Sequence, residues 1–317
     1  MQKRYFLAAM LCVAVSAFGD DSKGKQKEPE DLSDHNNNAP IEVMEIRGAS
    51  SSARVNQSRT RSPLMTYHGG KIMPTANIQS IFWGSSWTSS DPKITGLDSF
   101  YRGFSGSNYA KTSDEYTGPN GTSVGPTTVF AGHVIDTTAV SGINGGNNAT
   151  AVLAEVCKMV NNLDPTGNGY YPVYTDQKRG NAGFCAWHSQ GTCGNTTVQF
   201  AFFFNLDGDA GCDPVDKTTG NSQGLAALAN VSAHELSEAR TDPGNPGAWY
   251  DSSGSENGDK CAWTFGAPSV TFTYTDSITQ KQVSNNWKLQ GEWSNSAYSA
   301  GAGYPDSSGQ RGCLSGQ

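Results

Sequence analysis

The segment that says most about the fold of this chain is Ser232-Ala-His-Glu-Leu-Ser-Glu-Ala-Arg-Thr-Asp-Pro243. It closes a helical pattern that runs from Ser222 to Arg240 and stops before a proline and a glycine. Residues four apart share one face of a helix, so His234 and Glu238 are predicted to point at the same cation. Glu235 then lies beside that cation, where it can take a proton from water. The pattern His-Glu-x-x-Glu differs by one residue from the H-E-x-x-H of zinc peptidases.

A surface ion pair is the alternative interpretation of this motif. On an exposed helix, His234 and Glu238 would stabilise the chain by only about 0.2–0.5 kcal/mol. Most other positions of the helix are apolar, however, which favours a buried helix: Ala226, Ala227, Leu228, Val231 and Ala233. A buried histidine between two glutamates needs a partner, and a cation supplies one.

Candidates for the remaining metal ligands lie downstream of the helix in the sequence. A catalytic zinc needs about three protein ligands and an open position for water. Glu256 follows the helix carboxylate at a spacing like that of zinc peptidases whose third ligand is a glutamate, but here it lies in a Gly- and Ser-rich loop. Asp259 is almost as good a candidate, and Asp242 and His188 stay open. One imidazole with two carboxylates makes a hard site, which admits manganese or calcium besides zinc.

Composition indicates an exported globular protein. Only 16% of the 317 residues are charged, Gly is abundant at 37, and the net charge of −7 excludes the basic footprint of nucleic-acid binders. Residues 1–19 start with Lys3-Arg4 and continue with an apolar run too short for a membrane span, as in a secretory signal peptide. Residues 20–62 are polar and are predicted to be a disordered or propeptide-like lead-in. We therefore expect a secreted, extracellular or periplasmic monomer without nucleic-acid or membrane partners.

Six cysteines follow the signal segment, namely Cys157, Cys185, Cys193, Cys212, Cys261 and Cys313. An even number in an exported chain predicts disulfides. We expect Cys185 and Cys193 to close a small loop and Cys313 to bond Cys261. Free thiols or a cysteine metal site are the weaker alternative, since no C-x-x-C spacing occurs.

Helical and strand patterns alternate from residue 63 to the end. Apolar β-branched or aromatic runs predict strands at 77–83, 128–135, 170–175, 198–205 and 270–274. Helical patterns occupy 90–104, 148–160 and 222–240. We predict a single disulfide-stabilised α+β domain over residues 63–317, with a mixed sheet and the motif helix buried in it.

Four stretches in this order resemble the phosphate-induced, EXORDIUM-like family of secreted proteins, known chiefly from plant cell walls. They are Leu64–Gly70, Ile78–Gly84, Gly183–His188 and His234–Trp263, and the resemblance spans residues 63–317. The family's link to growth responses does not itself imply catalysis. The resemblance, with the intact His-Glu-x-x-Glu, implies two functions. One is a zinc metallohydrolase acting on peptides or another extracellular, cell-wall substrate, and the other is a non-catalytic binding or signalling protein with a structural ion or none.

Overall fold

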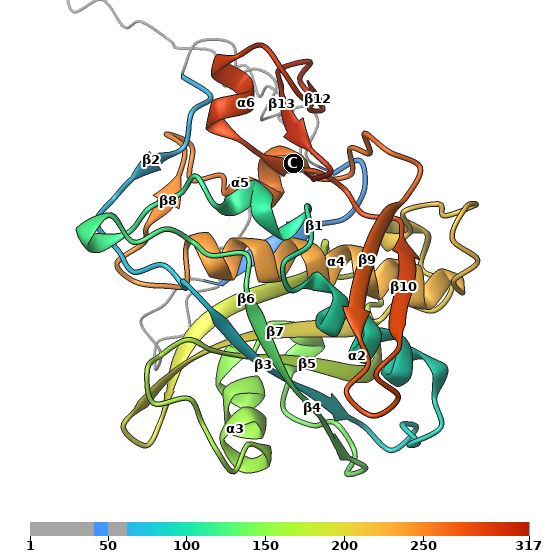
Figure 1. Cartoon of the computed structure of the whole chain (residues 1–317). Coiled ribbons are helices and arrows are strands. Elements are labelled where there is room, and N and C mark those ends of the chain that lie inside the picture. Colours follow the sequence, from blue (N-terminus) through green and yellow to red (C-terminus); the bar gives the residue numbers. More distant parts are fainter. Residues whose placement is uncertain (1–40, 50–61, 317) are drawn as a thin grey trace, which may run out of the picture. The chain divides into compact units, whose positions relative to one another are not determined.

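A mixed six-stranded sheet forms the centre of the domain in the computed structural model, which describes residues 41–49 and 62–316 (Figure 1). Its strand order is β1-β6-β7-β5-β3-β4. Strands β4, β3, β5 and β7 are parallel, whereas β6 is antiparallel to β7 and β1 is antiparallel to β6. The strands are β1 (Glu42–Glu45), β3 (Ala76–Trp83), β4 (Thr128–Asp136), β5 (Gly169–Lys178), β6 (Phe184–Cys193) and β7 (Thr196–Asn205). The predicted α+β fold with a mixed sheet is confirmed.

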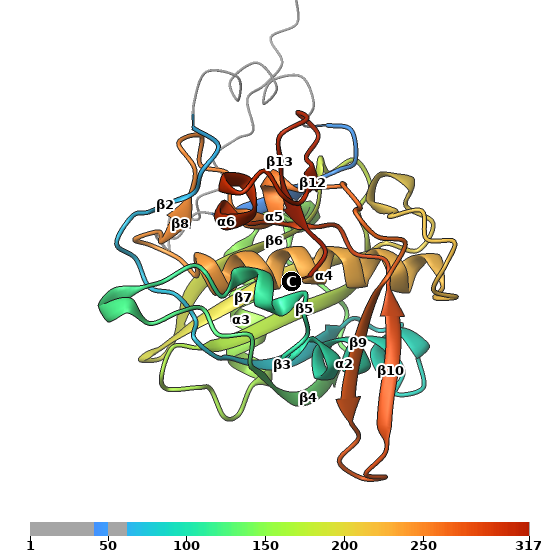
Figure 2. The same ribbon diagram turned by 45° about the horizontal axis from the view of Figure 1, so that its top comes forward.

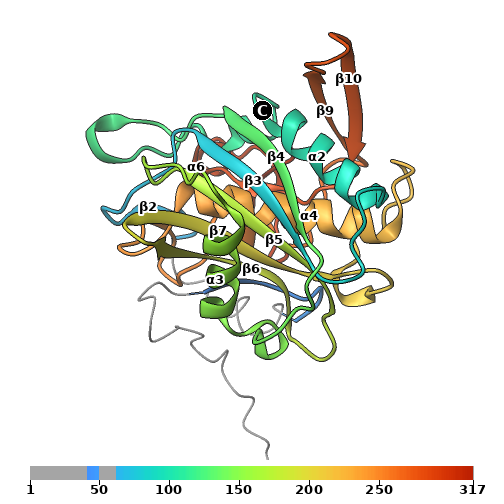
Figure 3. The same ribbon diagram turned by 90° about the horizontal axis from the view of Figure 1, so that it is seen from below.

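Helices cover both faces of this sheet (Figure 3). Helix α3 (Ala149–Met159) packs on one face, against β5, β6 and β7. Helices α4 (Gln223–Thr241) and α2 (Pro92–Phe104) lie together on the other face. Two predicted helix starts have their expected caps, because Asn148 accepts from the Ala151 N–H and Ser222 from the Leu225 N–H.

Helix α4 is buried along almost its whole length, from Gly224 to Thr241. One side faces the sheet, and α5 (Asn257–Lys260) packs against another side (Figure 2). The α5 helix in turn contacts β11 (Glu292–Trp293), which pairs with β13 (Arg311–Leu314) beside β12 (Tyr304–Pro305) and α6 (Asn295–Ser299). The helix therefore presents its polar side chains to protein on every side, which is what the alanine-rich sequence predicts.

Two antiparallel pairs of strands complete the domain. Strands β9 (Val270–Thr275) and β10 (Gln282–Trp287) pack on α2 (Figure 2). Strand β2 (Thr66–Tyr67) pairs with β8 (Trp249–Tyr250) near the end of α4 (Figure 1). There the His68 ring stacks on Tyr250 with centroids 3.6 Å apart.

Two strands of the sheet lie where the sequence predicts none. Strand β6 carries His188, Ser189 and Gln190, so it does not read as an apolar run, yet eight of its ten residues are buried between β1 and β7. Strand β1 lies inside the range 20–62 that the sequence predicts as a disordered or propeptide-like lead-in. Its Met44 is fully buried, and the Glu45 carbonyl accepts from Trp263 Nε1 at 2.9 Å.

Three disulfides bond the six cysteines that follow residue 19: Cys157–Cys193, Cys185–Cys212 and Cys261–Cys313. The predicted Cys261–Cys313 bond is confirmed. The predicted Cys185–Cys193 bond is wrong, because both residues lie on β6, where eight residues of extended chain hold their Cα atoms roughly 26 Å apart. A disulfide requires Cα atoms within about 7 Å.

Within residues 41–49 and 62–316, no helix is long and apolar enough to cross a membrane. The predicted signal segment, 1–19, lies outside the described residues.

Asn230, the asparagine of an N-glycosylation sequon inside α4, is fully buried, and its Oδ1 accepts from the Gln290 backbone N–H at 2.7 Å.

Candidate functional site

Helix α4 brings three ionisable side chains to the centre of the domain in three different directions. His234 faces α5 and the chain before β11, as its contact with Gln290 shows. Glu235 is one position on and faces β1, where the Met44 backbone N–H approaches its carboxylate. Glu238, one turn after His234, lies between these two directions and contacts both neighbourhoods. All three are at most 1% exposed.

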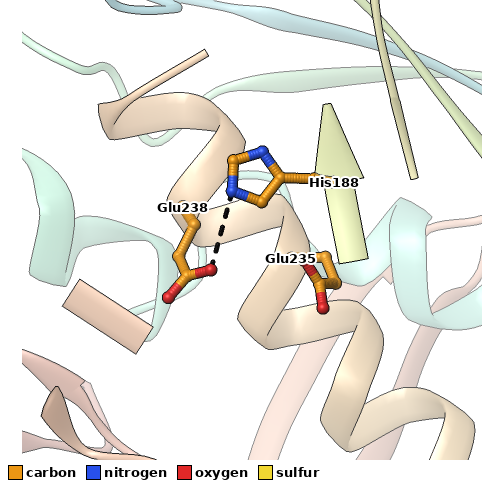
Figure 4. A group of neighbouring side chains, drawn as sticks. All are labelled: His188, Glu235 and Glu238. Atoms are coloured by element: carbon orange, nitrogen blue, oxygen red, sulfur yellow. Dashed lines mark ion pairs between the residues drawn. The ribbon is translucent and has the colours of Figure 1, made fainter. Parts of the chain in front are cut away.

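His188 reaches this centre from β6 (Figure 4). Its Nε2 lies 3.6 Å from Glu238 Oε2 and 3.5 Å from Glu256 Oε2. His188 and Glu256 are each only 3% exposed. Neither His188 Nε2 nor Glu256 Oε2 has a hydrogen-bond partner among the described residues. Two buried polar atoms therefore face each other without the hydrogen bonds that burial demands.

Helix α5 fixes the downstream carboxylates. Glu256 is its N-cap and forms a capping box with Asp259. The Asp259 backbone N–H donates to Glu238 Oε1 at 2.8 Å, so α5 is tied directly to the motif helix. Glu256 turns toward His188, while Asp259 groups with His234 and Glu238. Glu238 is thus common to both groups.

Gln290 determines the tautomer of His234. Its Oε1 accepts from the Trp263 N–H at 3.2 Å and its Nε2 donates to the Gly258 carbonyl at 2.9 Å, which fixes the orientation of the amide. The same Nε2 lies 2.9 Å from His234 Nδ1 and can only donate to it. Neutral His234 therefore carries its proton on Nε2, which lies 3.1 Å from Glu238 Oε2. His234 orients the carboxylate of Glu238, and its Nε2 has no lone pair left for a cation.

The protonation states on the β6 side suit cation binding. Burial lowers the pKa of His188 to about 4, against the attraction of Glu238, so its imidazole is neutral at pH 7. Burial raises the pKa of Glu238, but His234 and His188 outweigh it and the net pKa is lowered. A neutral imidazole beside an ionised carboxylate is the state that a divalent metal requires of its ligands.

Two further carboxyl groups, those of Glu235 and Glu256, have raised pKa values. Burial, then repulsion by Glu238 and Asp259, raises the pKa of Glu235 well above its ordinary value, although the Met44 N–H acts in the opposite sense. Burial, then repulsion by Asp242 and Glu238, does the same for Glu256. A cation between His188, Glu238 and Glu256 would remove this cost for Glu256, because it favours the ionised form.

Two distances from His188 Nε2 match the spacing of ligand atoms around a small divalent cation. Metal-to-ligand distances of about 2.1 Å in a tetrahedron place neighbouring ligand atoms about 3.4 Å apart. The distances from His188 Nε2 to the Glu238 and Glu256 oxygens, 3.6 and 3.5 Å, are close to that value. Among the described residues, the group whose ligand atoms all lie within 4.8 Å of one another around His188 consists of His188, Glu235 and Glu238 and does not include Glu256.

The structure thus brings together the residues that the sequence singled out. They form two groups around Glu238, one with His188 and one with His234. His188, one of the open alternatives, lies 3.6 Å from a Glu238 oxygen and 3.5 Å from a Glu256 oxygen, while the Asp259 backbone and His234 contact Glu238 from the other side. Asp242 lies at the C-terminal end of α4, where its Oδ1 accepts from the Ala248 N–H at 2.7 Å. Gln290 was not found by sequence reasoning, because it belongs to no motif and acts from 56 positions beyond His234.

Comparison with protein-family models, with curated proteins and with solved structures gives no match for this chain.

Proposed function

We propose that this protein is an exported metal-dependent hydrolase that cleaves amide bonds, with a peptide as substrate. The observation that carries the proposal is the position of His188 Nε2, 3.6 Å from Glu238 Oε2 and 3.5 Å from Glu256 Oε2. One imidazole and two carboxylates balance the charge of a divalent cation, for which zinc is the first choice and manganese the second. Such a cation would polarise a substrate carbonyl and acidify water.

Glu235 has the properties of a general base. Its carboxyl group lies within reach of His188 and Glu238, and burial raises its pKa above the ordinary value, as general bases in active sites require. In this role it takes a proton from the attacking water and passes it to the leaving amine. His234 and Gln290 hold Glu238 in place, and Asp259 does the same through its backbone.

Export and family membership belong to the same proposal. The apolar N-terminal segment and the three disulfides support an oxidising, extracellular location. The likeness to EXORDIUM-like proteins supports a cell-wall or extracellular setting. The rival proposal is a non-catalytic binding protein, which is favoured by the hydrogen bonds with which α5 and Gln290 fasten α4.

Metal analysis of the purified protein tests the proposal, together with hydrolysis of an unstructured protein substrate. We expect one equivalent of metal in the wild type and in Glu235→Gln, with hydrolysis only in the wild type. His188→Ala should lose both. His133→Ala is the matched control, because His133 on β4 pairs with Asp98 on α2, outside the site.

Metal bound by wild type and by His188→Ala alike would refute the ligand set. Metal without hydrolysis, with a Tm that falls on chelation, would establish the structural-ion alternative.

A further inference from the structure

The proposed ligands and the general base are too deeply buried for a peptide to reach them. Glu235 is 0% exposed, Glu238 1% and His188 3%. A cavity of about 290 Å³ reaches His188 and Glu256, but neither Glu235 nor Glu238 is among the described residues that line it. Its volume is at the lower end of the roughly 300–1,000 Å³ of small-molecule sites. A peptide can therefore meet all of these groups only if an element beside them moves.

Strand β1 is suited to this movement because it is a short strand at the edge of the sheet. It has four residues and pairs within the sheet with β6 alone. Its other attachments are the buried Met44 side chain, the contact of Glu45 with Trp263, and main-chain hydrogen bonds of Ile46 and Arg47. By contrast, α4 is buried along its length, β6 is paired on both edges, and α5 is hydrogen bonded to α4.

The same strand contacts the site at two points. Glu42 lies opposite His188 in the register of β1 and β6, and it lines the cavity. Two residues further on, the Met44 backbone N–H approaches the carboxylate of Glu235. A main-chain amide beside the general base is what an extended peptide would present there. Because β1 is extended and antiparallel to β6, it lies as an added peptide strand lies on a sheet edge.

We infer that β1 blocks the site as an internal, substrate-like strand, and that an extended peptide takes its place on β6 when β1 leaves. The inference rests on the proposed function, and it names both the mode of substrate binding and the step that controls it. Departure of β1 joins the cavity to Glu235 and frees the main-chain groups at the edge of β6, which can then pair with another strand. Strand β1 also belongs to residues 20–62, which the sequence predicts as a disordered or propeptide-like lead-in.

A protease site inserted after Ala49 tests this, because it separates β1 from the rest of the domain without changing a residue of the site. Residues 47–49 are exposed, and a Cβ at Gly48 would meet nothing within 4 Å. The matched control carries the same insertion after Ile278, which is 88% exposed in the turn between β9 and β10. Both proteins are cut, held in mild urea so that a released strand can exchange, and diluted into buffer.

We expect a fluorescent peptide of residues 41–49 to bind the protein cut after Ala49, and to bind neither the uncut protein nor the control. A peptide of the same composition in scrambled order should not bind. Cutting after Ala49 should also speed hydrolysis of an unstructured protein at least about tenfold, because the rate follows the fraction of molecules with an open site. An excess of the 41–49 peptide should reverse this gain.

Failure of the cut protein to take up the peptide, or equal hydrolysis before and after cutting, overturns the inference. Loss of the folding transition on cutting does so too, because β1 would then be a required part of the core. Uptake of the peptide by a protein that hydrolyses nothing in any form would leave β1 an exchangeable strand and reject the hydrolase. Hydrolysis by the uncut protein without peptide uptake would do the reverse.

Discussion

The carboxylate of Glu238 holds the site together. Its Oε1 accepts from the Asp259 backbone N–H, and its Oε2 lies 3.1 Å from His234 Nε2 and 3.6 Å from His188 Nε2. The two imidazoles on either side of it differ, because Gln290 donates to Nδ1 of His234 and so leaves the proton of neutral His234 on Nε2. A hydrogen-bond donor outside the motif therefore decides which histidine is available to a cation.

The tautomer of His234 is a direct test at this scale. Nitrogen-15 NMR of the histidine rings at pH 7 should show His234 protonated on Nε2 and unprotonated on Nδ1. In Gln290→Glu, the new carboxylate accepts instead of donating, so we expect both ring nitrogens of His234 to be protonated.

Gln290→Leu is the matched variant, which removes the donor without adding a charge. A wild-type His234 protonated on Nδ1 would contradict the assignment, and it would return His234 to the set of cation ligands.

At the scale of elements, the contact between α4 and α5 sets the positions of the Glu238 and Glu256 carboxylates relative to each other. A Cβ added at Gly258 would lie 2.9 Å from Glu238 Oε1 and 2.9 Å from His234 Nδ1. This approach is closer than real Cβ contacts, so a larger residue must move α5 away from α4. Glu256, the N-cap of α5, would move with it and away from His188.

We expect Gly258→Ala to lower the free energy of unfolding by about 1–3 kcal/mol, the usual effect of overpacking. It should also weaken metal binding. Urea unfolding and metal titration measure the two effects. Gly183→Ala is the control, because a Cβ there meets nothing within 4 Å. Unchanged stability and affinity in Gly258→Ala would mean that α5 is not held by this contact.

For the whole molecule, a second buried carboxyl group links the C-terminal sheet to α4. Glu292 on β11 accepts from Ser237 of α4, from Ser113 at 3.1 Å and from Asn257 of α5. Burial raises its pKa to about 7, although the hydrogen bonds from Ser237 and Ser113 and the Arg240 guanidinium act in the opposite sense. The folded protein keeps Glu292 protonated at a pH where the unfolded chain has lost the proton.

The contribution of Glu292 to the free energy of unfolding should therefore fall as the pH rises from about 4.5 to 7. Above that range, this contribution should be constant. Glu292→Gln cannot ionise, so its unfolding free energy relative to wild type should rise over this interval by at most about 3 kcal/mol. Urea unfolding between pH 4.5 and 8 measures the difference. Glu115→Gln, at a carboxylate that accepts from exposed Ser296, serves as the control. A pH-independent difference for Glu292→Gln would contradict the raised pKa.

The sequence by itself determined the elements whose signals are local. Helix α4 follows from its alanine-rich pattern and the Ser222 cap, and β3, β4, β5, β7 and β9 follow from apolar runs, each within a few residues. The motif on α4 also identified Glu235 and Glu238, because spacing along a helix fixes which side chains share a face.

Only the tertiary structure decided the pairing of these elements and the division of roles in the site. Strand β6 is buried by its neighbours β1 and β7, not by an apolar sequence of its own, so His188 did not stand out as a residue of the sheet. The same strand separates Cys185 from Cys193 and directs them to different partners. The choice between His188 and His234 depends on Gln290, whose approach to α4 comes from the packing of the C-terminal chain. Such contacts join residues far apart in the chain, and no local pattern records them because they depend on distance in space.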